Sequence, residues 1–338
     1  MKMWSTVGQD HILSQLRASL SDDRLAHAYL FIGPASVGKM CLAIDLAKAV
    51  NCLDDGPDPC GECNQCARII RGHHADVRIV SIVEKDSDRP TRTVIGIDDV
   101  KDILHQTNLK PFEGLCTVII FDGAENLSQE ASNALLKTLE EPSPQVLIIL
   151  LTNSEETILG TILSRCRSYR LRTSSKEAMQ SFLNDGYSSD RDQCEMIARI
   201  SRGCVGWAIR AVTDPQVLQQ READLDHILD TMKSGLYEKF NYANEMALEF
   251  GRDRTAVKEV LYLWKSWWRD LLLVKNVGED HVLSLHRLGT LTDQSFQLTT
   301  DDIVDFVKLI DHTLFALNHN ANTRVSFENL MINMPKIT

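Results

Sequence analysis

The sequence predicts an α/β domain built on a five-stranded parallel sheet, followed by helices that continue to the end of the 338-residue chain. Short apolar runs bounded by turn residues are typical of strands buried on both faces of a parallel sheet. One of these runs leads through a glycine-rich turn into a helix, which is the context of a phosphate-binding loop. From Ser174 onward, apolar residues recur at helical spacing with short turns between them, so that region is expected to be all-helical.

Spacing and boundary residues place the elements of the α/β region. Residues 9–20, residues 41–50 and the later part of 94–104 have helical spacing. Ser128 is the expected N-cap of the next helix, and Pro142 ends it because the residue before a proline is pushed out of the helical region. The other expected elements are strands at 28–32, 77–83, 117–122 and 146–151, an exposed charged loop at 84–92, a short helix at 158–163, and a fifth, edge-like strand that includes Tyr169 and Leu171.

The helical half of the chain predicts two further regions. Apolar spacing at 179–183, 194–200 and 205–212 indicates a compact helical lid, and 217–338 indicates a larger helical domain. We therefore expect domains at 1–172, 173–213 and 214–338. Three tryptophans on one strongly apolar helix are expected to be core or subunit contacts and not a base-stacking platform, because few basic residues lie between them. They are Trp264, Trp267 and Trp268.

The turn from Gly33 to Lys39, Gly-Pro-Ala-Ser-Val-Gly-Lys, predicts a phosphate-binding loop. Its backbone N–H groups and the following helix N-terminus would hold phosphates, and Lys39 would reach the terminal ones. Met40 stands where a serine or threonine hydroxyl would bind Mg²⁺. The alternative is a glycine turn that only links strand to helix, and binding of ATP or ADP stays open.

Asp122 ends the apolar run at 118–121, at the edge of the sheet where open α/β sheets bind ligands. In a nucleotide-hydrolysing protein of this kind, that aspartate helps to hold Mg²⁺ and the next residue polarises water. Gly123 cannot do acid–base chemistry. We expect a degenerate nucleotide site formed by Gly33, Gly38, Lys39 and Asp122, without Mg²⁺-dependent hydrolysis.

Four cysteines within residues 52–66 predict a structural zinc module. Cys52, Cys60, Cys63 and Cys66 lie in a loop rich in glycine and proline, and four thiolates at this spacing suit tetrahedral Zn²⁺ with no open position. A redox Cys-x-x-Cys pair and packed core cysteines are the alternatives. Core cysteines do not usually cluster in a polar loop, which favours zinc.

Composition excludes several classes of protein. The net charge of −11 argues against a chain that coats nucleic acid over its whole surface. The first residues do not resemble a signal peptide, and the most apolar helical stretch, 260–274, contains three charged residues and is too short to span a bilayer. We expect no membrane association and a cytoplasmic location.

Several motifs together resemble the AAA+ clamp-loader subunits of bacterial DNA polymerase III, the gamma/tau and delta-prime family. The resemblance covers nearly the whole chain and implies an AAA+ domain, a lid and a C-terminal helical collar. The residues that carry it are Trp4, Val7-Gly8-Gln9, residues 27–31, the loop at 33–39, the four cysteines, Asn133-Ala-Leu-Leu-Lys-Thr-Leu-Glu-Glu-Pro142, Ser164-Arg165-Cys166 and residues 322–330.

Within that family, the ATPase type is expected to have Gly-Lys-Thr/Ser, Asp-Glu and a sensor arginine in the lid. This chain has Met40, Gly123 and Gly206 at these positions and looks more like the delta-prime type. The resemblance therefore implies an ATP-inert scaffold that supplies Arg165 in trans to a neighbouring ATPase subunit. It also implies gamma/tau and delta subunits as partners, and the sliding clamp and primed DNA as partners of the complex.

Other interpretations remain at this point. Arg165 could be an ordinary surface ion pair at a helix end. The chain could be a weakly active gamma/tau-like ATPase in which Glu125 or another acid replaces the usual glutamate. It could also be a zinc-bearing DNA-binding module on a relic nucleotide fold, against which its acidic charge weighs.

Overall fold

The computed structural model describes residues 4–82, 94–107, 110–187, 190–318 and 321–337. The charged loop expected at 84–92 lies outside these residues. The described residues up to Val212 form one compact unit, and those from Thr213 onward form a second. Each unit is described by itself. Within the described residues, no helix is both long and apolar enough to cross a membrane.

The first unit contains the predicted five-stranded parallel sheet, with strand order β2-β3-β4-β1-β5. The register of the strands is fixed by one row of paired residues across the sheet: Ile79, Ile120, Ile149, Tyr29 and Arg167. The strand at 77–83 is shorter than predicted, and the fifth strand lies at the edge, as predicted. The bounds are β1 Ala28–Ile32, β2 Val77–Val80, β3 Thr117–Asp122, β4 Val146–Thr152 and β5 Arg167–Arg170.

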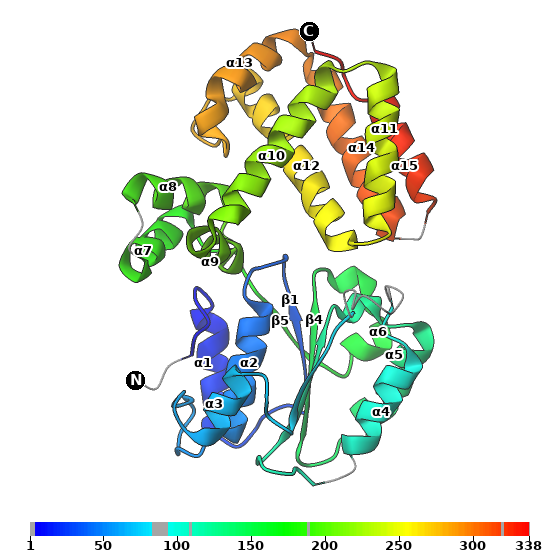
Figure 1. Ribbon diagram of the computed structural model, residues 1–338. Helices are drawn as coiled ribbons and strands as arrows, with labels where there is room; N and C mark the ends of the chain where they lie inside the picture. The colour runs from blue at the N-terminus through cyan, green and yellow to red at the C-terminus, as the bar shows by residue number, and fades with distance from the viewer. Residues whose placement is uncertain (1–3, 83–93, 108–109, 188–189, 319–320, 338) are drawn as a thin grey trace. The chain divides into compact units, whose positions relative to one another are not determined.

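Helices cover both faces of this sheet (Figure 1). Alternate strand residues enter two separate apolar clusters, so Tyr29 and Phe31 face α1 and α2, whereas Leu30 faces α4 and α5. The Ser128 hydroxyl accepts a hydrogen bond from the backbone N–H of Ala131 and caps α5, as predicted. The bounds are α1 Asp10–Ser21, α2 Lys39–Asn51, α3 Asn64–Ile70, α4 Ile97–Thr107, η1 Ala124–Asn126, α5 Gln129–Glu140, η2 Glu155–Thr157 and α6 Gly160–Leu163.

The same unit continues into the helices α7 Lys176–Gly186, α8 Arg191–Ile200 and α9 Val205–Thr213. The side-chain amide of Gln9 pairs with both backbone groups of Arg172, at 2.7 Å to its carbonyl oxygen and 3.1 Å to its nitrogen. Gly203 has φ +77°, and a Cβ there would lie 2.2 Å from the Ser174 carbonyl oxygen. Only glycine fits this close approach, which holds the start of the lid against the end of α8.

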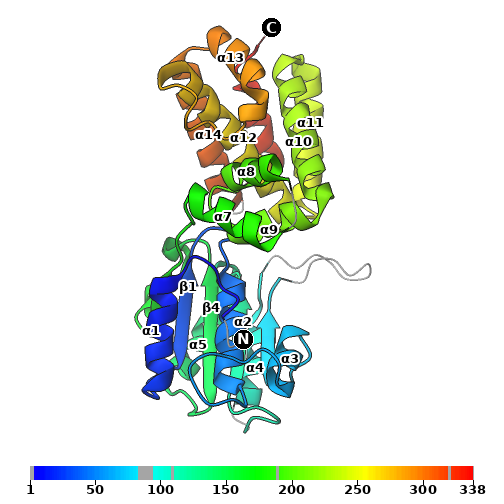
Figure 2. The same cartoon turned by 90° about the vertical axis from the view of Figure 1, so that its left-hand side faces the viewer.

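The second unit is all-helical, as predicted, and α12 packs against α14 within it (Figure 2). Trp264, Trp267 and Trp268 are fully buried, so the prediction that they belong to a core is confirmed. Trp267 donates its indole N–H to Gln294 Oε1 at 3.0 Å. The bounds are α10 Pro215–Lys233, α11 Leu236–Phe250, α12 Arg254–Asn276, η3 Leu285–Arg287, α13 Leu288–Gln297, α14 Thr300–Asn318 and α15 Thr323–Ile332.

Candidate functional site

The glycine-rich loop connects the carboxyl end of β1 to the start of α2. Gly33 directly follows the strand and donates its N–H to the Thr152 carbonyl oxygen at 3.1 Å. Gly38 precedes α2 with φ +111°, in the left-handed region that favours glycine. Ser36 also has positive φ, at +59°. The loop is therefore in the predicted place, between a buried strand and a helix N-terminus.

The Lys39 ammonium is bonded to groups of this chain. Its Nζ donates to the carbonyl oxygens of Gly33 and Pro34 at 2.5 and 3.0 Å and to Asn153 Oδ1 at 2.7 Å. An ammonium has three protons, so these acceptors use its full donor capacity. Burial lowers the pKa of Lys39, and the nearby carboxylates of Glu125 and Asp122 oppose this shift. In this state Lys39 holds the loop together and does not project from it.

Asn153 is a site residue that the sequence analysis missed. Its Oδ1 accepts from Lys39, and its Nδ2 donates to Glu125 Oε1 at 3.0 Å, so it bridges a cation and an acid. The sequence could have indicated it, because Asn153 directly follows β4, and Asp122 ends β3 at the same carboxyl ends of the strands.

Two acids, Asp122 and Glu125, lie near the loop at the carboxyl end of β3. Asp122 ends β3, where partial desolvation of its carboxyl group raises its pKa and Lys39 opposes the rise. No hydrogen bond of the described residues joins Lys39 to Asp122 or Glu125. Gly123 has φ +79° and ψ 55°, and a Cβ there would lie 2.6 Å from Asn126 Nδ2. A glutamate at this position would be strained in the present backbone.

The lid helix α9 lies against the same loop. The backbone N–H of Gly206 donates to the Ser36 carbonyl oxygen at 2.8 Å, and Arg210 Nη2 donates to Ser36 Oγ at 3.1 Å. A Cβ on Gly206 would lie 2.9 Å from that carbonyl oxygen, so only glycine allows this contact without a shift. Met40, on the other side, packs against the apolar cluster under α1 and α2. Two of the three positions at which this chain departs from the ATPase pattern are thus used for close backbone approach, at Gly206, and for packing, at Met40.

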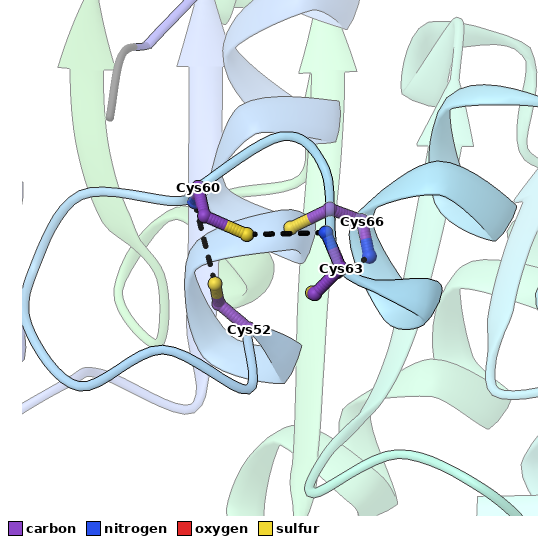
Figure 3. A group of neighbouring side chains, drawn as sticks. All are labelled: Cys52, Cys60, Cys63 and Cys66. Atoms are coloured by element: carbon purple, nitrogen blue, oxygen red, sulfur yellow. Dashed lines mark hydrogen bonds between the residues drawn. The ribbon is translucent and has the colours of Figure 1, made fainter. Parts of the chain in front are cut away.

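The four cysteines lie in and beside the loop between α2 and α3, with their sulfur atoms directed toward one another (Figure 3). The ligand atoms are all within 4.8 Å of one another, and all four residues are free cysteines. Cys60, Cys63 and Cys66 donate backbone N–H groups to the sulfurs of Cys52, Cys60 and Cys63 at 3.3, 3.3 and 3.5 Å.

This donor set fits a tetrahedral metal ion. Zinc–sulfur bonds of about 2.3 Å require sulfurs about 3.8 Å apart, so only a small contraction of the cluster is needed. Desolvation opposes ionisation of Cys63, but backbone N–H groups including those of Leu53 and Cys66 overcome it, and the pKa of this thiol falls to about 7. The cluster can hold a metal ion structurally and leaves no position for a substrate.

Polar contacts fix this cysteine module to the sheet domain. Asp58 Oδ1 accepts from the Trp4 indole at 2.8 Å and from Arg17 Nε at 2.6 Å. On its other side, Gln65 Nε2 donates to the Glu113 carbonyl oxygen at 2.5 Å. Asn51, one residue before Cys52, accepts at Oδ1 from the backbone N–H groups of Leu115 and Cys116, just before β3.

Arg165 follows α6 and precedes β5. Its Nη1 donates to the Thr161 carbonyl oxygen at 2.9 Å and to Ser164 Oγ at 3.1 Å, and its Nη2 lies 2.8 Å from Glu140 Oε1. The surface ion pair considered from the sequence is therefore present, with the two side chains 35% and 52% exposed.

Arg165 and the glycine-rich loop lie at opposite ends of the strands: Arg165 at the amino end and the loop at the carboxyl end. β1 and β5 are parallel, and Arg167 is the first residue of β5, whereas Gly33 follows the last residue of β1. A five-residue strand is about 16 Å long. The structure thus brings Gly33, Gly38, Lys39 and Asp122 to the carboxyl ends of the strands and leaves Arg165 at their amino ends.

Comparisons with known proteins show which proteins the chain resembles. The family model described as DNA polymerase III, delta subunit, matches residues 8–175. The delta' subunit of Bacillus subtilis (strain 168) is 24% identical over 96% of this chain and 95% of its own length. The tau/gamma subunit of Haemophilus influenzae is 39% identical over 49% of this chain, which spans only 23% of that relative. A solved gamma subunit-related protein from Thermotoga maritima covers 95% of this chain and 98% of its own at 16% identity and a TM-score of 0.44.

Proposed function

The chain belongs to the AAA+ clamp-loader family of DNA polymerase III, and from that premise we propose that it is a delta-prime-type subunit. In this proposal it has no working ATPase site and supplies Arg165 in trans to an ATPase subunit. Its partners would be gamma/tau-type and delta-type subunits, and the complex would load a sliding clamp onto primed DNA during replication.

The proposal that this chain does not hydrolyse ATP rests on the state of the glycine-rich loop. Hydrolysis needs a hydroxyl for Mg²⁺, an acid that positions water, and a lysine free to reach the terminal phosphates. Met40 and Gly123 lack the first two groups, and Lys39 is held by Gly33, Pro34 and Asn153. Since Gly123 also occupies a positive-φ position, a single substitution would not restore the acid in the right geometry.

The position of Arg165 supports a role in trans. The residue lies about one strand length from the loop of its own chain and keeps 35% of its side chain exposed. On a neighbouring ATPase, its planar guanidinium would bind γ-phosphate oxygens through two parallel hydrogen bonds and stabilise the charge of the transferring phosphoryl group. The cysteine module would hold structural zinc through Cys52, Cys60, Cys63 and Cys66, with no part in this chemistry.

Two measurements test the proposal. The isolated chain should hydrolyse ATP at background rate, and turnover that is lost in Lys39→Ala would favour the weakly active gamma/tau-like alternative. In a complex reconstituted with gamma/tau-type and delta-type subunits, Arg165→Ala should lower turnover at the site it serves by roughly 10³-fold or more, without loss of assembly. Arg165→Lys should recover little of the turnover, because an ammonium is a point charge and cannot form the two parallel hydrogen bonds of a guanidinium. Arg167→Ala, an exposed arginine two residues along, is the matched control, and equal turnover of the Arg165→Ala and wild-type complexes would refute the role.

A further inference from the structure

We propose that Glu140 is a positioning residue for Arg165. It would hold the guanidinium in an orientation ready for a neighbouring subunit before that subunit docks. The inference rests on the proposed function in trans and adds a second residue to it. The contact that carries it is the 2.8 Å ion pair between Glu140 Oε1 and Arg165 Nη2.

The surroundings of Arg165 restrict its side chain from two sides. Thr161 and Ser164 hold Nη1 through oxygens of the same turn, while Glu140 holds Nη2 from another helix. An arginine side chain has large rotamer freedom that binding must remove. A guanidinium has five N–H donors, and among the described residues no hydrogen bond uses Nε of Arg165. The side chain is thus oriented while donors remain for a phosphate.

The place of Glu140 in its helix supports a role outside that helix. Glu140 is the last residue of α5, where the partial negative charge of the helix C-terminus disfavours a carboxylate. The preceding carbonyl oxygen, of Leu139, lies 3.1 Å from His27 Nε2, just before β1 begins. Glu140 is therefore fixed near the amino ends of the strands, where Arg165 also lies. The ion pair with Arg165 offsets the unfavourable position of this acid at the helix C-terminus.

The test compares reconstituted complexes that contain wild-type chain, Glu140→Ala, Arg165→Ala or the double variant. Because the ion pair is half-exposed, loss of Glu140 should lower kcat about two- to five-fold with KM for ATP unchanged. In the Arg165→Ala background, removal of Glu140 should have no further effect. Glu141→Ala is the matched control, since Glu141 is the adjacent exposed acid and no ion pair of the described residues joins it to Arg165.

Three results would overturn the inference. Unchanged or faster turnover of Glu140→Ala would mean that the ion pair is incidental or restrains Arg165. An equal loss in the Arg165→Ala background would mean that Glu140 only supports the fold. If Arg165→Ala itself is silent, the role in trans fails, and the role of Glu140 fails with it. Size-exclusion chromatography of each complex separates these outcomes from failed assembly.

Discussion

Replacement of Gly206 by alanine should loosen lid helix α9 from the glycine-rich loop. The new Cβ would lie 2.9 Å from the Ser36 carbonyl oxygen, 3.5 Å from its carbonyl carbon and 3.5 Å from its Cα. Backbone atoms of a tight loop cannot move aside as the end of a flexible side chain can. Helix α9 must therefore shift, and the 2.8 Å hydrogen bond from Gly206 to Ser36 is lost or stretched.

Three contributions set the size of the effect. The lost hydrogen bond costs about 1 kcal/mol, and residual overlap costs about 1–3 kcal/mol. Alanine recovers about 0.5–1 kcal/mol, because glycine is unfavourable inside a helix. The net loss of about 1–3.5 kcal/mol corresponds to a roughly 5- to 400-fold faster local opening. Gly186→Ala, at the end of α7 with no atom within 4 Å of the new Cβ, is the control and should be neutral or slightly stabilising.

Hydrogen exchange followed by mass spectrometry measures this opening directly. In Gly206→Ala, peptides that cover 33–39 and 205–213 should exchange faster, whereas Gly186→Ala should leave both unchanged. ATP turnover should stay at background, because Met40 and Gly123 are unaltered. Unchanged exchange in both peptides of Gly206→Ala would refute the reasoning that this glycine seats the lid on the loop.

Three further predictions concern the metal cluster, the buried Asp76 and the half-buried Glu222. Purified protein should contain one zinc per chain by elemental analysis, Cys60→Ser should lose it, and Cys116→Ser should keep it; metal-free wild-type protein would contradict the assignment. Asp76→Ala should lower the free energy of unfolding of the first unit by about 3–5 kcal/mol in urea titrations, because this buried carboxylate accepts backbone N–H bonds from three consecutive residues after Pro111. A loss below about 1 kcal/mol would contradict this role of Asp76. The hydrogen bond from His286, followed by Arg287, lowers the pKa of Glu222 from 4.5 to about 2, so its stabilisation is present above pH 4.5 and is lost as pH falls toward 2. The gap in urea midpoint between wild type and Glu222→Gln should shrink over that range; a constant gap would refute the assignment.

Local patterns were sufficient to predict most of the fold. The strands were visible as apolar runs because a strand buried on both faces needs apolar residues throughout, as β4 shows. β2 was predicted too long because it is an edge strand with only Val80 buried, so its apolar pattern did not mark where pairing ends. The cysteine cluster was readable because all four ligands fall within fifteen residues.

Contacts between distant segments could not be read from the sequence. Lys39 is bonded to Asn153, 114 residues later, and Arg210 reaches back 174 residues to Ser36. No spacing rule links such positions, because only the folded chain brings the end of β4 and helix α9 to the glycine-rich loop. The sequence shows that Gly206 stands where an arginine was expected, but its contact with the loop is a property of the folded backbone.

The pairing of Gln9 with Arg172 has a consequence for biosynthesis. The two residues are 163 positions apart, and a ribosome adding about 5–20 residues per second needs roughly 8–33 s to make the chain between them. During that interval, the amide of Gln9 in the nascent chain lacks its final partner. The pairing can close only after β5 has been made, since Arg172 lies two residues beyond the end of that strand. The pairing of Gln9 with Arg172 therefore closes late in the synthesis of the first unit, shortly before the first lid helix, α7, is made.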